Sequence, residues 1–139
     1  MSWANGYIGI PYCDLGRDRQ GCDCWGLARL VYAEELGLHL LSYVGDYACA
    51  EEQAEVATLI DAESGQSPWS RIAVPKPFDL LLFRRGRFAS HVGIMVSRTR
   101  MLHVAGDEQA KIEDVTSARW GKRRIAAFRH VGRPLKVPS

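Results

Sequence analysis

The spacing of apolar residues changes near the middle of this chain, and that change constrains the fold more than any other feature. Between residues 24 and 38, apolar residues recur at the spacing of one face of a helix. From residue 79 onward they fall in short or alternating runs separated by turn residues, which is typical of strands. A helical first half followed by a β-rich second half predicts an α+β domain.

These patterns also predict the individual elements. We expect a helix over residues 24–36, with Asp23 as its N-cap and Gly37 as its stop, and a second helix with an acidic face over residues 47–62. Residues 64–77 are rich in Ser, Gly and Pro and are expected to form a loop anchored by Trp69. Strands are expected at residues 79–83, 91–97, 100–105, 111–115 and 124–130. Residues 1–139 then form a single domain, with 43–77 as an inserted helix and loop and 131–139 as a tail.

The charge and hydropathy of the chain exclude some classes of partner. The net charge of +2 is too small to indicate nucleic acid by itself, and the Lys and Arg residues gathered at 84–87 and 119–133 are most simply a solvated face. No stretch approaches the roughly 20 apolar residues that span a bilayer. Residues 1–6 lack the pattern of a signal peptide. We therefore expect no nucleic acid partner, no direct membrane insertion, and a location in the cytosol or outside the cell by a route that this chain does not encode.

The four cysteines do not form an obvious metal site. Structural zinc sites use paired Cys-x₂₋₄-Cys units or Cys/His knuckles, whereas this chain has one Cys-x-Cys, at Cys22 and Cys24, and two scattered residues, Cys13 and Cys49. A disulfide among Cys13, Cys22 and Cys49 stays open. We expect neither a metal nor a cofactor.

Cys24 is the candidate nucleophile because it begins the first predicted helix. The first turn of a helix presents unpaired backbone N–H groups and the positive end of the helix dipole, and both favour a thiolate. Gly26, two residues after Cys24, has no Cβ and would let a substrate approach closely. A cysteine that only fills the core is the alternative, since free cysteine is often buried.

A nucleophilic cysteine needs a base, and His91 and His103 are the candidates. They lie in two alternating runs, SHVGIMV and MLHVAG, that predict a β-hairpin. A two-residue loop at 98–99 would point the two rings to opposite faces, whereas a three-residue loop at 97–99 pairs Val96 with Arg100 and makes the rings diagonal neighbours.

Hydrophobic alternation selects the three-residue loop. In that register one face, an evident core face, carries Val92, Ile94, Val96, Leu102 and Val104. The other face carries His91, Gly93, Met95, Met101, His103 and Ala105. The sequence therefore predicts a site in which Cys24 attacks a carbonyl, His91 moves the proton, and His103 orients His91. Backbone N–H groups at the start of the helix would stabilise the oxyanion. Two unrelated histidines on a polar face are the alternative.

The same residues resemble a known family. GIPYCDLGRDRQGCDCWGLARLVYAEELGL, FDLLLF, SHVGIMV and MLHVAG together resemble the NlpC/P60 cysteine peptidases, from about Trp3 to His130. The resemblance is to the phage and prophage tail-associated branch, similar to the peptidase part of tail assembly protein K. It implies a papain-like α+β fold, with N-terminal helices packed on an antiparallel sheet.

The resemblance also implies roles for individual residues. Cys24 matches the family's nucleophile, His91 its base and His103 its third polar residue. Tyr12 matches a tyrosine that assists at the nucleophile, with half-buried packing as an equal alternative, and Asp23 and Trp25 fall at the substrate-binding positions. The implied reaction is hydrolysis of peptidoglycan stem peptides at a bond of the D-glutamyl–diaminopimelate type.

Three departures from the family pattern stand out. Trp25 occupies a position where many members have serine, Phe78 replaces a usual glycine before Asp79, and residues 43–77 are longer than in minimal members. The expected setting is a phage tail tip or tail-like particle in contact with other tail proteins, or the host cytoplasm before assembly, with action in the cell envelope. A structural tail component with an auxiliary or inactive site, and a thiol-dependent acyltransferase or amidase, are the alternative functions.

Overall fold

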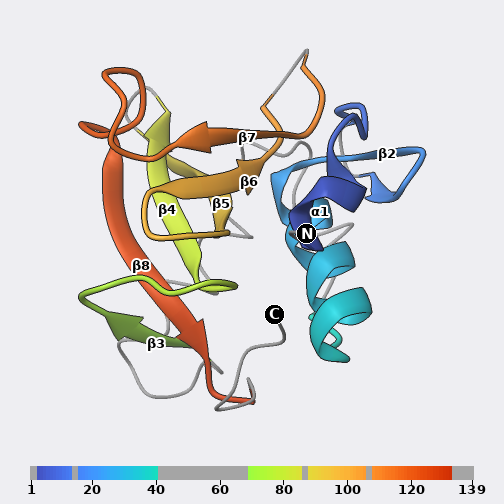
Figure 1. Ribbon diagram of the computed structural model, residues 1–139, viewed down its shortest axis with the longest axis horizontal. Helices are drawn as coiled ribbons and strands as arrows, with labels where there is room; N and C mark the ends of the chain where they lie inside the picture. The colour runs from blue at the N-terminus through green and yellow to red at the C-terminus, as the bar shows by residue number, and fades with distance from the viewer. Residues whose placement is uncertain (1–2, 14–15, 41–68, 86–87, 106–107, 133–139) are drawn as a thin grey trace.

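The computed structural model describes residues 3–13, 16–40, 69–85, 88–105 and 108–132 of the chain (Figure 1). The predicted helix at 47–62 and Cys49 lie outside these residues, as do residues 133–139 of the predicted tail. Within the described ranges, no helix is long and apolar enough to cross a membrane.

The N-terminal part is a short 3₁₀-helix at Trp3–Tyr7, a small ribbon of β1 (Arg17–Asp18) and β2 (Gly21–Cys22), and the helix α1 (Cys24–Val31). Asp23 caps α1 as predicted, because its Oδ1 accepts a hydrogen bond of 2.6 Å from Gly26 N. Beyond Val31 the chain continues as a π-helical stretch, Tyr32–Leu36, and stops at Gly37 with a left-handed φ of 67°. The predicted helix therefore has the expected span, although its second half is more loosely wound.

The C-terminal part is a six-stranded antiparallel sheet in the order β3-β8-β4-β5-β6-β7. Its strands are β3 (Trp69–Ile72), β4 (Leu80–Arg85), β5 (Phe88–Met95), β6 (Arg100–His103), β7 (Lys111–Asp114) and β8 (Arg124–His130). Five of these correspond to the predicted strands, and the α+β prediction is consistent with the structure. Residues 69–72 correct the prediction of a loop over 64–77, because this segment pairs with the end of β8 as an edge strand. Trp69 is buried, as the anchoring role requires.

The β5–β6 hairpin has the predicted register. Ile94 pairs with Leu102 and Met95 with Met101, and Val96 N donates a hydrogen bond of 2.9 Å to Arg100 O across the three-residue loop. The alternation of apolar residues was sufficient to fix this register, because a slip by one residue would exchange the two faces.

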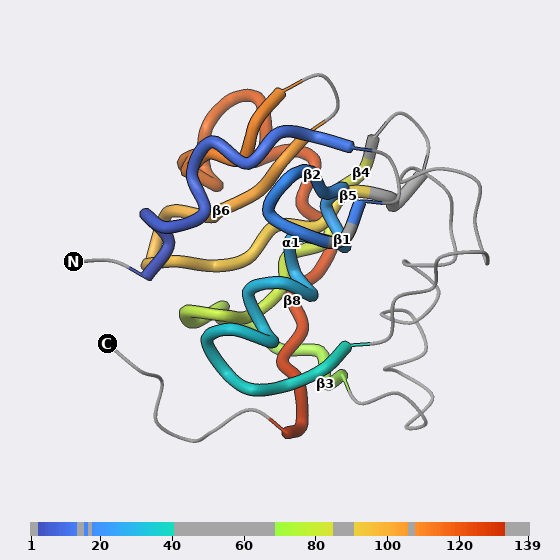
Figure 2. The backbone as a smooth tube through the Cα atoms, turned by 90° about the vertical axis from the view of Figure 1, so that its right-hand side faces the viewer, coloured from blue at the N-terminus to red at the C-terminus, as the bar shows by residue number. Residues whose placement is uncertain are grey.

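Both faces of the sheet carry buried side chains, which argues against the alternative of two unrelated histidines on a polar face. On one face, side chains of β4, β5 and β6 share a buried cluster with α1, which contacts β5; the cluster includes Trp25, Leu27, Val31, Leu80, Leu82, Val92, Ile94, Leu102 and Val104. Figure 1 shows α1 beside the sheet, and Figure 2, seen from the side of the helix, shows α1 in front of the strands. On the other face a second cluster gathers around Trp120, with Leu81, Phe83, Met95, Met101, Val115 and Ala127. His91 and His103 therefore lie among apolar side chains rather than on a solvated surface.

Candidate active site

Cys24 is the first residue of α1 and is 4% exposed. The cap fixes its position tightly, because Asp23 accepts from Gly26 N through its side chain and from Leu27 N through its carbonyl. The thiol thus starts a well-ordered helical turn, where the helix dipole favours the thiolate. Because the cap engages the Gly26 N–H, an oxyanion would have to use other donors.

Gly26 has a structural reason that differs from the predicted one. A Cβ at this position would lie 2.0 Å from the carbonyl oxygen of Gly16 and 3.1 Å from Asp23 Oδ1. The glycine therefore allows the loop before β1 to approach the helix, whereas we had expected it to admit substrate.

Asp23 and Trp25 occupy structural positions on either side of Cys24. Asp23 is fully buried and serves as the cap of α1. Trp25 is 1% exposed, and its ring meets Trp69 edge to face with a centroid separation of 6.4 Å. These placements favour packing and capping over the substrate contact that the resemblance implied.

The structure brings the two predicted histidines together. His91 on β5 and His103 on β6 are 1% and 0% exposed, and His91 Nε2 lies 2.9 Å from His103 Nδ1. Trp120 closes one side of the pair, with its ring stacked on His91 at a centroid distance of 4.9 Å and an interplanar angle of 23°. The pair is therefore held by both a hydrogen bond and ring packing.

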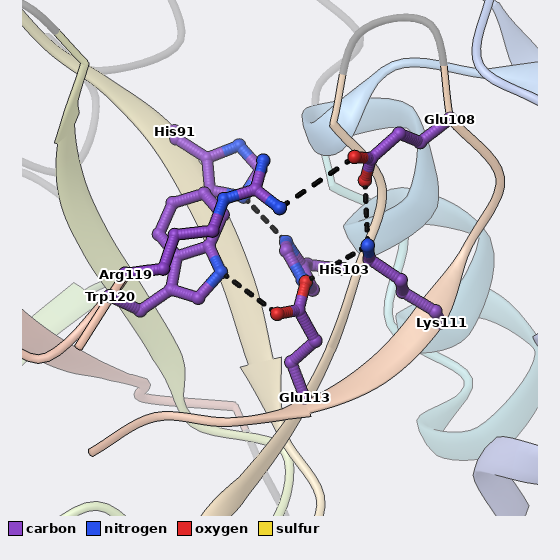
Figure 3. Close-up of polar contacts among 7 residues, drawn as sticks. All are labelled: His91, His103, Glu108, Lys111, Glu113, Arg119 and Trp120. Carbon is purple, nitrogen blue, oxygen red and sulfur yellow. Dashed lines mark hydrogen bonds and ion pairs between the residues drawn. The ribbon is translucent and has the colours of Figure 1, made fainter. Parts of the chain in front are cut away.

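Glu113 and Trp120 belong to this site, and sequence reasoning missed both. Glu113 Oε1 lies 2.8 Å from His103 Nε2, and Trp120 Nε1 donates to Glu113 Oε2 at 3.3 Å (Figure 3). His103 on β6 pairs with Lys111 on β7, and Glu113 is two residues after Lys111 on β7. Glu113 therefore lies on the same face of the sheet as Lys111 and can reach His103. The alternation in residues 111–115 could have placed Lys111 and Glu113 on one face, but the loop before β7 leaves no sequence signal for the β6–β7 register.

Charged groups surround Glu113 at the edge of the sheet. Lys111 Nζ lies 3.3 Å from Glu113 Oε1 and 2.9 Å from Glu108 Oε2, and Arg119 lies 3.6 Å from Glu108 Oε1. Figure 3 shows the resulting chain of contacts from His91 through His103 and Glu113 to Lys111 and Glu108. These outer groups are partly exposed, so they tune the site more than they stabilise the fold.

The protonation states of the inner groups follow from their surroundings. Burial lowers the pKa of His103 from its ordinary value, although the hydrogen bond to Glu113 acts in the opposite direction. Burial works to raise the pKa of Glu113, but the hydrogen bond from His103 and the charge of Lys111 outweigh it and leave this pKa below its ordinary value. Near pH 7, His103 is therefore neutral and Glu113 is ionised.

Tyr12 lies close to both halves of the site. Its backbone forms a bridge with Cys22, two residues before Cys24, and its N–H donates to Glu108 O at 3.0 Å. The neighbouring residues Pro11 and Gln109 form a second bridge and line a surface hollow of about 550 Å³ together with Glu108 and Lys111. The backbone thus places Tyr12 between the segment that carries the thiol and the segment that carries Glu113.

The remaining cysteines and histidines are placed elsewhere. Among the described cysteines, Cys13 and Cys22 form no disulfide with each other. His130 packs against Trp69 and Tyr32 near the end of β8, and its burial lowers its pKa. His39 is exposed.

Comparisons with known proteins extend these observations. Residues 9–129 match the sequence profile of the NlpC/P60 family. The murein DD-endopeptidase MepS/murein LD-carboxypeptidase of Escherichia coli is 26% identical over 125 residues, which cover 90% of this chain and 58% of that protein. The chain thus spans less than two thirds of the curated relatives it matches.

Two solved structures show the same fold. The NlpC/P60 domain of the peptidoglycan hydrolase SagA has a TM-score of 0.61 at 22% identity, with 91% of this chain and 92% of that chain covered. A lipoprotein-like NLP/P60 family protein from Staphylococcus aureus has a TM-score of 0.64 at 24% identity, with 92% of this chain and 39% of that chain covered. Identities this low support a common fold and say nothing of a shared substrate.

Proposed function

This chain belongs to the NlpC/P60 family, and on that premise we propose that it hydrolyses an amide bond in the stem peptides of peptidoglycan, with Cys24 as nucleophile and His91 as base. His103 orients His91, and Tyr12 assists at the thiol. The observation that carries the proposal is the buried hydrogen bond of 2.9 Å between His91 and His103, in which His91 lies on β5, the strand that α1 contacts. Two buried histidines in one hydrogen-bonded pair are the arrangement that a cysteine nucleophile requires of its base and orienting residue.

We infer the working nitrogen of His91 from its contact with His103. Its Nε2 is hydrogen-bonded to His103, so in this proposal Nδ1 exchanges the proton with the Cys24 thiol. In the first half of the reaction, His91 takes the thiol proton, and the sulfur attacks the amide carbon. As the C–N bond breaks, His91 returns the proton to the leaving amine, and a thioester forms.

The second half of the reaction regenerates the thiol. His91 Nδ1 takes a proton from a water molecule, and the oxygen attacks the thioester carbon. The C–S bond breaks, the peptide leaves as a carboxylic acid, and His91 returns the proton to the Cys24 sulfur. Apart from the substrate and one water molecule, no group outside the chain is needed to balance the two halves.

Family membership and the curated relative support the substrate class. The relative is named as a murein DD-endopeptidase and LD-carboxypeptidase. The narrower assignment, a bond of the D-glutamyl–diaminopimelate type cut by a domain of a phage tail tip or tail-like particle, rests on the resemblance of the sequence motifs. The test below therefore reads out the bond as well as the activity.

The proposal is tested by muropeptide release from purified peptidoglycan. We expect wild-type protein to release soluble fragments and Cys24→Ala to lose at least about a thousandfold in rate, since the nucleophile has no substitute. Cys13→Ala, an exposed thiol outside the site, is the matched control and should retain wild-type activity. Mass spectrometry of the fragments identifies the cleaved bond, because hydrolysis adds one water across it.

Two results would contradict the proposal. Equal release by wild type and Cys24→Ala would mean that Cys24 is not the nucleophile. No release by wild type on any peptidoglycan type would leave the domain with a structural role, the alternative expected for a tail component.

A further inference from the structure

We propose that Glu113 is a fourth, positioning member of the site, which fixes the proton positions on both histidines and thereby selects Nδ1 of His91 as the basic nitrogen. The catalytic meaning of this inference rests on the proposed function, whereas the proton positions themselves do not. Glu113 acts only through His103. In the scheme above it contacts neither His91 Nδ1 nor the reacting atoms.

The inference begins with the position of His103 between two partners. Its Nδ1 faces His91 Nε2 at 2.9 Å, and its Nε2 faces Glu113 Oε1 at 2.8 Å. Its side chain is 0% exposed, so both ring nitrogens are matched to protein groups within a buried setting. Each bond must have one donor and one acceptor, and a neutral imidazole has one of each.

The charge of Glu113 settles which nitrogen carries which proton. An ionised carboxylate can only accept, so His103 Nε2 must carry the proton and His103 Nδ1 must be the acceptor. His91 Nε2 must then donate to His103 Nδ1, which leaves the lone pair of neutral His91 on Nδ1. The three groups form a directed chain, and its direction is the one that cysteine attack needs.

The reverse chain would disable the base. If His103 carried its proton on Nδ1, it would donate to His91 Nε2, and neutral His91 would hold its own proton on Nδ1. That nitrogen could then not accept the thiol proton. A negative charge at Glu113 makes this arrangement unfavourable, because His103 Nε2 and the carboxylate would face each other as two acceptors.

Glu113 is itself held in place from two sides. Trp120 Nε1 donates to its Oε2 at 3.3 Å, and Lys111 Nζ lies 3.3 Å from its Oε1. Trp120 also stacks on His91 and meets His103 edge to face at 4.9 Å. One indole therefore contacts all three hydrogen-bonded groups, His91, His103 and Glu113. Arg119 and Glu108 complete the charged surroundings, with Glu108 paired to both Lys111 and Arg119. Lys111 and Arg119 disfavour a charged His103, which helps to keep that ring neutral.

Glu113→Gln tests the inference because it keeps the size of the side chain and removes its charge. If the amide oxygen faces His103, the amide nitrogen faces the Trp120 N–H, and two donors oppose each other. If the amide is turned, it donates to His103 Nε2 and favours the reverse chain. Neither orientation reproduces the wild-type contacts.

The direct experiment is long-range ¹H–¹⁵N NMR of the histidine rings in the full chain. We expect both His91 and His103 of the wild type to carry the neutral-state proton on Nε2. In Glu113→Gln, we expect mixed proton positions at His103 and a protonation midpoint of the histidine pair that is lower by about one pH unit. A proton on Nδ1 of either ring in the wild type, or an unchanged midpoint in Glu113→Gln, would overturn the proposal.

Glu108→Gln is the matched control. It removes one negative charge from the same cluster, as Glu113→Gln does, and it also removes a partner of Lys111. Glu108 forms its ion pairs with Lys111 and Arg119 and not with a histidine. We expect it to leave the proton position on His103 unchanged and to shift the midpoint much less. An equal shift in both variants would mean that only the general field of the cluster acts on the histidines.

Kinetics then connect the proton positions with catalysis. With peptidoglycan as substrate, we expect Glu113→Gln to lower kcat about 10- to 100-fold with little change in KM, the effect of losing one charge-assisted hydrogen bond. The limb of the pH profile that reports the histidine pair should move to lower pH. A purely structural role would lower the amount of folded enzyme without moving that limb. If wild type has no activity, the proposed function fails, and the NMR result still decides the role of Glu113.

Discussion

Phe78 has a backbone conformation that is unusual for any residue other than glycine. Its φ is 74°, and it is the one described non-glycine residue with a positive φ. Such a conformation costs roughly 1–2 kcal/mol for a residue with a Cβ. Phe78 is nevertheless fully buried, stacks on Trp3 at 4.4 Å and donates from its N–H to Met95 O at 2.7 Å, while its carbonyl accepts from the Tyr32 hydroxyl. The departure from the glycine that the resemblance implies at this position thus has a physical consequence, a strained backbone held by packing.

The strain at Phe78 reverses the usual order of two substitutions. We expect Phe78→Gly to lose about 2–3 kcal/mol of stability, since the loss of the buried ring exceeds the strain relieved. Phe78→Ala should lose about 1 kcal/mol more, because alanine keeps the strain and also lacks the ring. Denaturant unfolding measures both. An alanine variant more stable than the glycine variant would show that the backbone is not strained.

At the scale of elements, the start of α1 depends on a close approach between segments. Gly16, before β1, places its carbonyl oxygen against Gly26, and a Cβ on Gly16 would itself lie 2.4 Å from Gly21 O. The β1–β2 ribbon and the first turn of α1 are therefore packed backbone to backbone. This packing fixes the helix end on which the Cys24 thiol is carried.

Gly26→Ala should disrupt this junction. The added Cβ would lie 2.0 Å from a backbone oxygen that cannot rotate away, so we expect a loss of about 3 kcal/mol or more in the free energy of unfolding. Gly6→Ala is the control, because a Cβ at Gly6 meets no atom within 4 Å. Thermal unfolding compares the two. Similar melting temperatures would mean that the loop at Gly16 can yield.

At the scale of the whole molecule, the sheet buries side chains on both faces, and ionisable groups are buried with them. Burial lowers the pKa of His103 and of His130, on strands β6 and β8. Several carboxylates have lowered pKa values instead, because partners stabilise their charge; they include Glu34, hydrogen-bonded to Arg19, and Glu108, hydrogen-bonded to Lys111. The two groups of residues make stability depend on pH in two separate ranges.

We expect stability to fall as the pH drops below about 6.5, the ordinary histidine pKa. There the unfolded chain binds protons that the buried histidines of the folded chain do not, which costs at most about 1.4 kcal/mol per pH unit for each histidine. A second loss should begin near pH 4.5, where the unfolded carboxylates take up protons before the folded ones do. Calorimetry from pH 7.5 to 5.5 tests the first range. His130→Gln should flatten that slope, whereas His39→Gln, at an exposed position, should not; equal slopes would contradict the assignment.

The features that the sequence by itself determined are local or periodic. Contacts within a few residues determine the first helix, with its cap at Asp23, its span from Cys24 to Leu36 and its stop at Gly37. The His91–His103 pair follows from a hairpin with a short loop and a strict alternation. Each of these is fixed by neighbours that the chain itself places close together, so spacing alone was sufficient.

The tertiary structure alone decided the features that join distant segments. The β3 strand forms because β8 offers it an edge. Glu113 and Trp120 reach the histidines because β7 pairs with β6, and the sequence between these strands does not indicate their register. Trp25 and Gly26 owe their roles to Trp69 and Gly16, which no local pattern connects to them. Such pairings depend on the balance of packing over the whole molecule, and for that reason the sequence predicted two histidines of the site but neither the carboxylate nor the indole that holds them.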